Sequence, residues 1–457
     1  MSRPIILIHG YSDEGPSFFR WREILCSRGF ETKTINVCDY KTLTNEVTIK
    51  DLAEGFDRAL KFKFKNEYDK NRNFEFDAIV HSTGMLVLRS WLATYPGKRL
   101  VRLKHLIGLA PASFGSPLAY KGRSWIGSLF KGNKKWGPDF MEAGDKVLDG
   151  LELGSAFTWN LAHQDLLNEN KTFYGPDPNT PYVFIFIGDQ RYGKVYDTIT
   201  KAPGTDGTVR HAGCSLNTRK ISIDFTEPPG SDKRYTITEW GEDSRSNIGI
   251  PFVPIKGLNH ATILEEPSTE LQDLVIGALQ VNDKESLQKW NDNARASTAA
   301  TYNSIKKYQQ FVVHCVDERG DGISDFHIQI YRAEDLNNED PVDMEMHPYS
   351  SDNSYRCYHV DLDSIKYKEL QGLKIELTAS SGSELVGYSQ NLADDIKGKG
   401  ESTSTISLDL TQEMLNTNLK FFYPFTTTLI EFVLNREPLP LNDHNNLVKF
   451  IEAKGQR

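Results

Sequence analysis

One short stretch constrains the fold more than any other, because it joins a strand, a sharp turn and a helix. The run 76–80 is apolar apart from Asp77 and leads directly into His81-Ser82-Thr83-Gly84. An apolar segment, 85–95, follows and is typical of a buried helix. Ser82 is therefore expected on a strand-to-helix turn that lifts its hydroxyl off the sheet edge. The same turn points the first amide groups of the helix toward a reacting group.

The length and charge of the chain narrow the class of protein. A chain of 457 residues is too long for one ordinary domain, so we expect two. The net charge of -9 argues against a general nucleic-acid-binding protein, and we expect no nucleic-acid partner. The five cysteines are widely spaced, which indicates reduced thiols and no zinc site.

Two observations bear on the cellular location. The first residues contain only a short apolar run that leads into the first expected strand, unlike a cleavable signal peptide. No uninterrupted apolar run approaches the roughly 18 residues that a transmembrane helix needs. We therefore expect a cytoplasmic protein by default, and secretion without a signal peptide stays open.

The first 282 residues alternate strand-like and helix-like segments. This alternation predicts an α/β domain over 1–282, with a mostly parallel sheet and helices on both faces. The pattern is interrupted between about 116 and 170, where we expect a cap or lid insertion. The expected strands are 5–8, 31–37, 76–80, 103–109, 182–187, 219–225 and 252–255.

The pattern changes after residue 282. Residues 283–307 are polar, contain neither proline nor glycine, and predict a linker helix. From 308 to 437, apolar and polar residues alternate in short runs such as Phe326–Tyr331 and Leu373–Leu377. Short alternating strands separated by turns predict an antiparallel β-sandwich. Residues 438–457 are expected to form a C-terminal tail.

Acyl transfer by serine requires a nucleophile, a histidine base and a carboxylate that orients the histidine. Ser82 is the candidate nucleophile, although the same turn suits a serine that only caps a helix. His260 is the candidate base, because it follows a strand-like segment and precedes the last helix of the α/β part. His163 and His211 are weaker alternatives. We expect the side chain of His81 to point away from the nucleophile.

The candidate acid is Asp206, which lies between Gly204 and Gly207. Glycines on both sides let a loop turn tightly and bring the carboxylate to the histidine. Asp189 also ends an expected strand and is the alternative. Either aspartate also suits a turn in which it bonds its own backbone.

The oxyanion of an acyl-transfer intermediate needs two N–H donors. The backbone N–H of Thr83, directly after the nucleophile, is one candidate. The second is expected in the loop after the first strand, where we choose Tyr11, because Gly10 permits a close backbone approach.

Four segments together resemble the motif set of bacterial lipases and esterases of the α/β-hydrolase superfamily. They are His9-Gly10, the His81–Gly84 turn, Thr205–Val209 and Asn259–Ile263. The resemblance covers roughly residues 1–282 and implies Ser82, Asp206 and His260 as a catalytic triad, with Tyr11 and Thr83 as oxyanion donors. The sequence departs from the family pattern at Val80, where the family usually has Gly or Ala. A hydrolase followed by a β-sandwich also resembles some phospholipases in architecture.

The segment Lys121–Trp136 mixes aromatic and aliphatic residues with lysines. That mixture suits a lid that touches a lipid surface, and equally a cap helix whose aromatic side chains pack on the core. We expect part of the substrate-binding surface here and nearby. The candidate substrate-binding residues are Leu118, Trp125, Phe130 and Phe140, and Leu151, Phe157 and Trp159 are also expected to line or cover an acyl pocket.

Together these patterns predict a serine carboxylic-ester hydrolase, of lipase or phospholipase type, that needs no metal and no organic cofactor. The expected partner is a lipid or another apolar ester, with transient contact to a membrane or lipid interface. Two alternatives stay open. One is a hydrolase of small soluble esters, thioesters or amides, and the other is a non-catalytic binding protein on a hydrolase fold.

Overall fold

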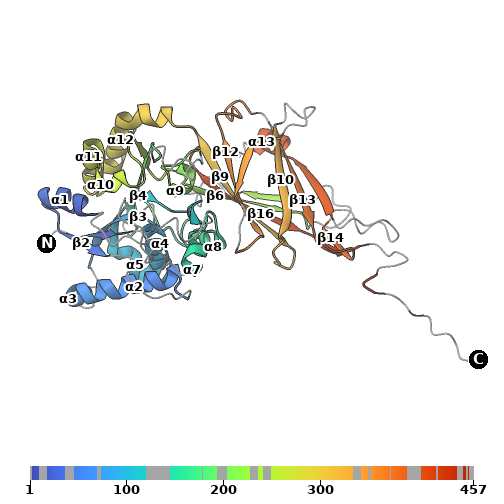
Figure 1. Ribbon diagram of the computed structural model, residues 1–457, viewed down its shortest axis with the longest axis horizontal. Coiled ribbons are helices and arrows are strands. Elements are labelled where there is room, and N and C mark those ends of the chain that lie inside the picture. The colour runs from blue at the N-terminus through green and yellow to red at the C-terminus, as the bar shows by residue number, and fades with distance from the viewer. Residues whose placement is uncertain are drawn as a thin grey trace, which may run out of the picture.

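The computed structural model contains a parallel sheet in its N-terminal part (Figure 1). Its six strands lie in the spatial order β2, β1, β3, β4, β5, β8, and every neighbouring pair is parallel. The bounds are β1 Ile5–Ile8, β2 Thr32–Ile35, β3 Phe76–Ser82, β4 Leu103–Pro111, β5 Tyr182–Gly188 and β8 Phe252–Ile255. The structure describes residues 3–9, 18–35, 46–68, 74–119, 145–177, 179–192, 203–226, 235–239, 249–332, 341–347, 351–370, 372–388, 403–417, 420–439, 446–448 and 451.

Helices cover both faces of this sheet, as the alternating pattern predicts. Figure 1 shows α10, α11 and α12 on one side of the strands, with α2, α4 and α5 on the other. The helix bounds are α1 Phe19–Ser27, α2 Ile49–Lys63, α3 Lys65–Tyr68, α4 Gly84–Thr94, α5 Pro96–Arg99, the 3₁₀ helix η1 Leu100–Arg102, α7 Asp145–Leu151, α8 Ala156–Gln164, α9 His211–Cys214, α10 Thr262–Glu265, α11 Thr269–Ala278, α12 Lys284–Ser304 and α13 Thr411–Thr417.

The central strands explain where a site can form. Every residue of β1 and of β3 is buried, because helices cover both sides of the sheet. The carboxyl ends of parallel strands meet at one edge, and ligands of such sheets bind outside that edge. Ser82 ends β3 there, and the chain leaves β5 and β8 at the same edge.

The C-terminal part is built from β-sheets. Its described strands form a six-stranded sheet in the order β11, β12, β9, β16, β6, β7, a three-stranded sheet β10, β13, β15, and the pair β14–β17. The bounds are β6 Thr218–Asp224, β7 Thr236–Glu239, β9 Tyr308–Asp317, β10 Asp325–Arg332, β11 Met344–His347, β12 Tyr355–Asp361, β13 Leu373–Ser380, β14 Val386–Tyr388, β15 Thr403–Asp409, β16 Thr427–Leu434 and β17 Arg436–Pro438.

The alternating runs of the sequence are strands of this part, with their apolar residues inside. Buried and partly exposed residues alternate along β13, and Ile375 and Leu377 are buried. They share one apolar cluster with Phe311 of β9 and Phe432 of β16, which belong to the larger sheet. A shared core between two sheets confirms the predicted β-sandwich.

Two features of the sandwich differ from the expectation. The segment 219–225 is a strand, but β6 pairs with β16 of the C-terminal sheet and not with the parallel sheet of the N-terminal part. The larger sheet is also mixed, since β16 runs parallel to both β6 and β9. The first 282 residues therefore contribute strands to both sheets. The domain limits at 282, 307 and 437 stay predictions.

The two parts share a continuous apolar junction. Val312 of β9 and Leu429 of β16 belong to the apolar cluster of the N-terminal part, although their strands lie in the C-terminal sheet. Trp159 of α8 packs edge-on against His314 and Tyr355 of the same sheet. Trp159, which was expected to line or cover an acyl pocket, thus packs against the C-terminal sheet, and its role in a pocket stays a prediction.

The helix predicted over 283–307 is present as α12. Asp283 begins it in a capping box with Ser286. The ring of Trp290 lies 4.5 Å from that of Phe184 in β5, so this helix packs on the parallel sheet. Among the residues that the structure describes, no helix has the length and apolarity to cross a membrane.

Candidate active site

Ser82 lies on a sharp turn between β3 and α4. Its φ of 52° falls in the left-handed region, which L-residues rarely adopt and which often marks functional turns. Gly84 is required two residues later, because a Cβ atom there would lie 2.9 Å from the carbonyl oxygen of Ile8. The sequence thus produces the predicted strand–turn–helix, with β1 passing directly beside the turn.

The helix after Ser82 is anchored by a buried ion pair. Arg89 of α4 donates to both carboxylate oxygens of Asp165, at 2.7 and 2.9 Å, and to the carbonyl oxygen of Ser113 at 2.6 Å. Tyr174 donates its hydroxyl to the same carboxylate at 2.7 Å. Because neither charged side chain is exposed, this two-point contact holds α4 in one orientation.

His260 and Asp206 lie in direct contact. The Nδ1 atom of His260 is 2.8 Å from Oδ2 of Asp206, and both side chains are fully buried. The other carboxylate oxygen accepts the backbone N–H groups of Thr208 and Val209 at 3.0 and 2.9 Å. A carboxylate in this position can accept a proton from Nδ1 of His260, and the tautomer that donates it has Nε2 as its basic atom.

The alternative acid has another role. Oδ1 of Asp189 accepts the backbone N–H of Gly257 at 2.6 Å and the side-chain amide of Gln190 at 3.1 Å. It therefore ties the end of β5 to the turn after β8. The alternative bases are also engaged elsewhere, since Nε2 of His211 lies 3.2 Å from the carbonyl oxygen of Gly188 and Nδ1 of His163 lies 2.9 Å from that of Trp159.

His81 lies against the candidate base. Its ring lies 4.6 Å from the ring of His260, and its Nε2 atom is 3.0 Å from the carbonyl oxygen of His260. Burial lowers the pKa of His81 well below its usual range, and charges on His260 and His9 lower it further. His81, the residue directly before Ser82, is therefore neutral, and its ring packs against that of the candidate base His260. The sequence signal for this contact was the histidine directly before Ser82.

Ser82 is less accessible than expected. Only 3% of the residue is exposed, and His260 and Asp206 are not exposed at all. Thr83 is fully buried directly behind Ser82, at the start of α4.

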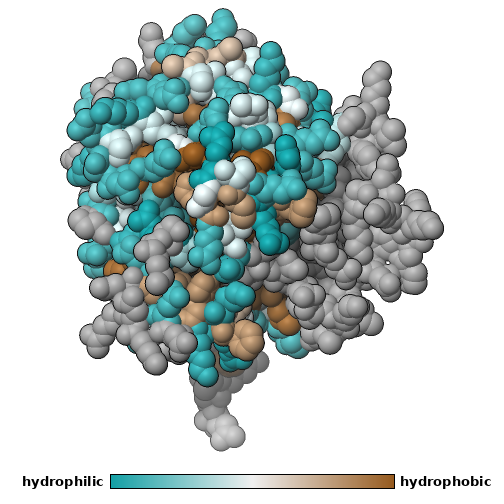
Figure 2. All heavy atoms as spheres, turned by 90° about the vertical axis from the view of Figure 1, so that its left-hand side faces the viewer, coloured by the Kyte–Doolittle hydropathy of each residue, from teal (hydrophilic) through white to brown (hydrophobic). Residues whose placement is uncertain are grey.

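Four of the predicted site residues, Tyr11, Trp125, Phe130 and Phe140, lie outside the described residues. Leu118 is described and is buried in the apolar core of the N-terminal part. Figure 2 shows the end of the molecule opposite the C-terminal part, where apolar residues among those coloured are scattered between polar ones. The predicted lipid contact at Lys121–Trp136 lies outside the described residues and stays a prediction.

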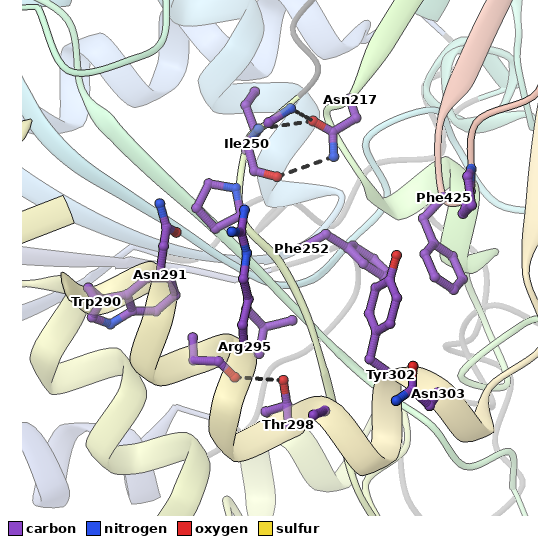
Figure 3. Close-up of a pocket in the computed structure, with 16 residues that line it drawn as sticks. Asn217, Ile250, Phe252, Trp290, Asn291, Arg295, Thr298, Tyr302, Asn303 and Phe425 are labelled. Atoms are coloured by element: carbon purple, nitrogen blue, oxygen red, sulfur yellow. Dashed lines mark hydrogen bonds between the residues drawn. The ribbon is translucent and has the colours of Figure 1, made fainter. Parts of the chain in front are cut away.

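A separate pocket of about 430 Å³ lies between α12 and the start of β8 (Figure 3). Phe252, Tyr302 and Phe425 form one of its walls, and Arg295 lies across from them. The start of a parallel strand is the edge opposite to its carboxyl end, and His260 follows the carboxyl end of β8. This pocket is therefore distinct from the site around Ser82.

Buried histidines make stability depend on pH. Burial lowers the pKa values of His81, His211 and His359, whereas histidines of an unfolded chain titrate near 6.5. Below that pH the unfolded chain binds protons that the folded protein does not, so stability falls as pH falls. Each group contributes up to about 1.4 kcal/mol per pH unit.

We therefore expect the urea midpoint of unfolding to drop between about pH 7 and about pH 5.5. A His359→Gln variant should show a shallower dependence, because it removes one such group but keeps a donor for Gln310, which His359 Nε2 contacts at 2.9 Å. Equal slopes in the two proteins would contradict the assignment.

Comparison with known proteins gives matches to solved structures. No family model matches the chain, and no curated protein matches it by sequence. Phospholipase PlaB from Legionella pneumophila matches with a TM-score of 0.77 at 20% identity, over 99% of this chain and 98% of that chain. The same enzyme in complex with thio-NAD matches with a TM-score of 0.75, at the same identity and coverage. The mature lipase BlEst2 from Bacillus licheniformis matches at 13% identity and a TM-score of 0.38, over 60% of this chain and 91% of that chain.

The match to PlaB, at a TM-score of 0.77, bears on the fold of the chain. The chain has the α/β-hydrolase fold with a β-rich C-terminal part, as the sequence motifs predict. The likeness to PlaB extends over essentially the whole of both chains, so the combination of the two parts is shared as well.

Proposed function

We propose that this α/β-hydrolase-fold protein is a serine hydrolase that cleaves carboxylic esters of lipids. The observation that carries the proposal is the contact of 2.8 Å between His260 and Asp206 at the sheet edge where Ser82 ends β3. The left-handed backbone of Ser82 supports it, because a serine that only capped α4 would not need that conformation.

In the proposed mechanism, Nε2 of His260 takes the proton of the Ser82 hydroxyl while Oγ bonds to the ester carbonyl carbon. Asp206 stabilises the resulting imidazolium. The backbone N–H groups of Thr83 and Tyr11 are the proposed donors to the tetrahedral oxyanion. The carbon–oxygen bond of the ester then breaks, and the leaving alcohol takes the proton from Nε2. Water repeats the sequence on the acyl-enzyme, which releases the acid and restores Ser82.

A lipid ester is the proposed substrate for two reasons. The protein that this chain resembles over its full length is named a phospholipase. In addition, Ser82 is 3% exposed, which fits an enzyme that opens at a lipid surface better than one that meets small solutes freely. The apolar and basic segment Lys121–Trp136 is the proposed contact with that surface.

A series of acyl esters of increasing chain length tests the substrate class. We expect the specific activity to rise with chain length, and to rise again when the substrate passes its critical micelle concentration, because the aggregate offers the surface that favours the open state. The initial rate is measured below and above that concentration for each ester. Preference for short soluble esters with no gain at the interface would contradict the lipid proposal while leaving a serine hydrolase.

A further inference from the structure

The loop that carries Asp206 lies between the two parts of the molecule. We call residues 203–214 the acid loop. On the side of the loop that faces the N-terminal part of the molecule, the backbone N–H of His260 donates to the carbonyl oxygen of Asp206 at 3.1 Å. The N–H of Phe114 donates to the carbonyl oxygen of Gly213 at 2.9 Å. Its other side meets the C-terminal sheet.

A charged contact joins the acid loop to that sheet. Nη2 of Arg210 donates to Oε1 of Glu345 in β11 at 2.5 Å, and Nη1 donates to the carbonyl oxygen of Pro203 at 2.6 Å. Arg210 thus closes the base of the loop and connects it to the C-terminal part. The side chain of Arg210 is 3% exposed, whereas that of Glu345 is 48% exposed. A buried cation depends strongly on its counter-charge. Because Glu345 supplies that charge to Arg210, its position in β11 constrains the position of the acid loop.

Close steric contacts act in the same direction. A Cβ atom on Gly204 would lie 2.5 Å from the ring of Tyr308, and one on Gly213 would lie 2.7 Å from Oε1 of Gln310. Tyr308 and Gln310 both belong to β9. The glycines at the two ends of the acid loop therefore let the backbone lie directly against the C-terminal sheet.

The same sheet also reaches the strand that leads to His260. The ring of Phe425, just before β16, lies 4.9 Å from that of Phe252 in β8, and the two rings stack. Phe425 also lies 6.4 Å from the ring of His211 in the acid loop. One residue of the C-terminal part thus contacts both the acid loop and β8.

From these contacts we propose that the C-terminal part positions Asp206 against His260, with the Arg210–Glu345 pair as its main connection. The proposal rests on the proposed function and gives the β-sandwich a role in the reaction. Arg210 and Glu345 are positioning residues, since they act through the loop and touch no substrate. A displacement of the acid loop by about 1 Å would weaken the contact with His260, and such shifts cost up to about a hundredfold in rate.

The variant Glu345→Gln tests this role with little risk to folding, because the side chain is half exposed. We expect kcat for an acyl ester to fall about tenfold while KM stays within about twofold, since substrate binding is untouched. The control is Glu376→Gln on β13, which removes the partly buried partner of Lys374, at 2.5 Å, in the three-stranded sheet. Thermal unfolding of both variants is measured in parallel, and kcat is compared at a temperature at which both are folded, because the buried Arg210 loses its counter-charge.

A double-mutant cycle separates the pair from general effects. If Glu345 acts through Arg210, the further loss on adding Glu345→Gln to Arg210→Gln should be negligible. Glu345→Asp, which keeps the charge, should recover part of kcat. Equal kcat values for Glu345→Gln and Glu376→Gln in an active wild-type background would overturn this inference and leave the proposed function intact.

A spectroscopic readout is independent of turnover. The proton on Nδ1 of His260, held by Asp206, should give a downfield ¹H NMR signal in the wild-type protein that shifts or broadens in Glu345→Gln and not in Glu376→Gln. An unchanged signal would overturn the positioning role. A wild-type protein that hydrolyses no ester but shows the variant-specific shift would contradict the proposed function alone.

Discussion

Replacing Ser82 by alanine is expected to reduce ester hydrolysis by at least about 10⁴-fold, to the level left by substrate binding and the oxyanion donors. The substitution removes only Oγ, and Ala fits the buried site without a clash. The left-handed backbone of residue 82 is held by the turn between β3 and α4, so the fold is expected to persist. The initial rate against one acyl ester, compared between wild-type and variant protein, measures the effect.

Ser90→Ala is the matched control for this variant. Ser90 lies on α4, the helix that begins directly after the turn, and is also buried. We expect its activity to stay within about twofold of wild type, since the residue lies two turns beyond the nucleophile. A Ser82→Ala protein that folds and keeps more than about a hundredth of the wild-type rate would contradict the assignment.

The second large effect is expected at the candidate acid. Asp206→Asn should lower kcat by about 10⁴-fold, because an amide opposite Nδ1 of His260 favours the tautomer that cannot accept the serine proton. The geometry around residue 206 should be retained, since the amide oxygen still accepts the N–H groups of Thr208 and Val209. The rate should be measured across a range of pH, so that a shift in the pH dependence of kcat is distinguished from the loss of a catalytic group.

Asp189→Asn serves as the comparison, because the two aspartates were the sequence-based candidates for one role. Asp189 holds Gly257 and does not contact the imidazole through any described hydrogen bond. We expect its substitution to cost less than about tenfold in kcat, mainly through a looser turn after β8. A larger loss at residue 189 than at residue 206 would reverse the assignment of the acid.

The parts of the site that local sequence determines could be predicted. The turn at Ser82 follows from an apolar strand, a small residue where β1 passes, and an apolar helix. The tight loop around Asp206 follows from Gly204 and Gly207, both of which adopt positive φ. The order of Ser82, Asp206 and His260 along the chain then agrees with an edge at which parallel strands end together.

Features that depend on distant packing could not be predicted. The segment 219–225 has the apolar pattern of any buried strand, and only its pairing with β16, some 200 residues later, decides which sheet it joins. The contact of His81 with His260 joins residues 179 positions apart, which no local pattern brings together. The burial of Ser82 likewise depends on the whole surroundings of the turn.

The identity of the reactive residue tests the central claim most directly. A fluorophosphonate probe reacts with a serine only when a neighbouring base activates it, so the folded wild-type protein should gain one adduct when the probe is added together with lipid micelles. Mass spectrometry of the digested protein should locate that adduct on Ser82, and Ser82→Ala should remain unmodified. An adduct on any other residue, or no adduct on protein shown to be folded, would contradict the account.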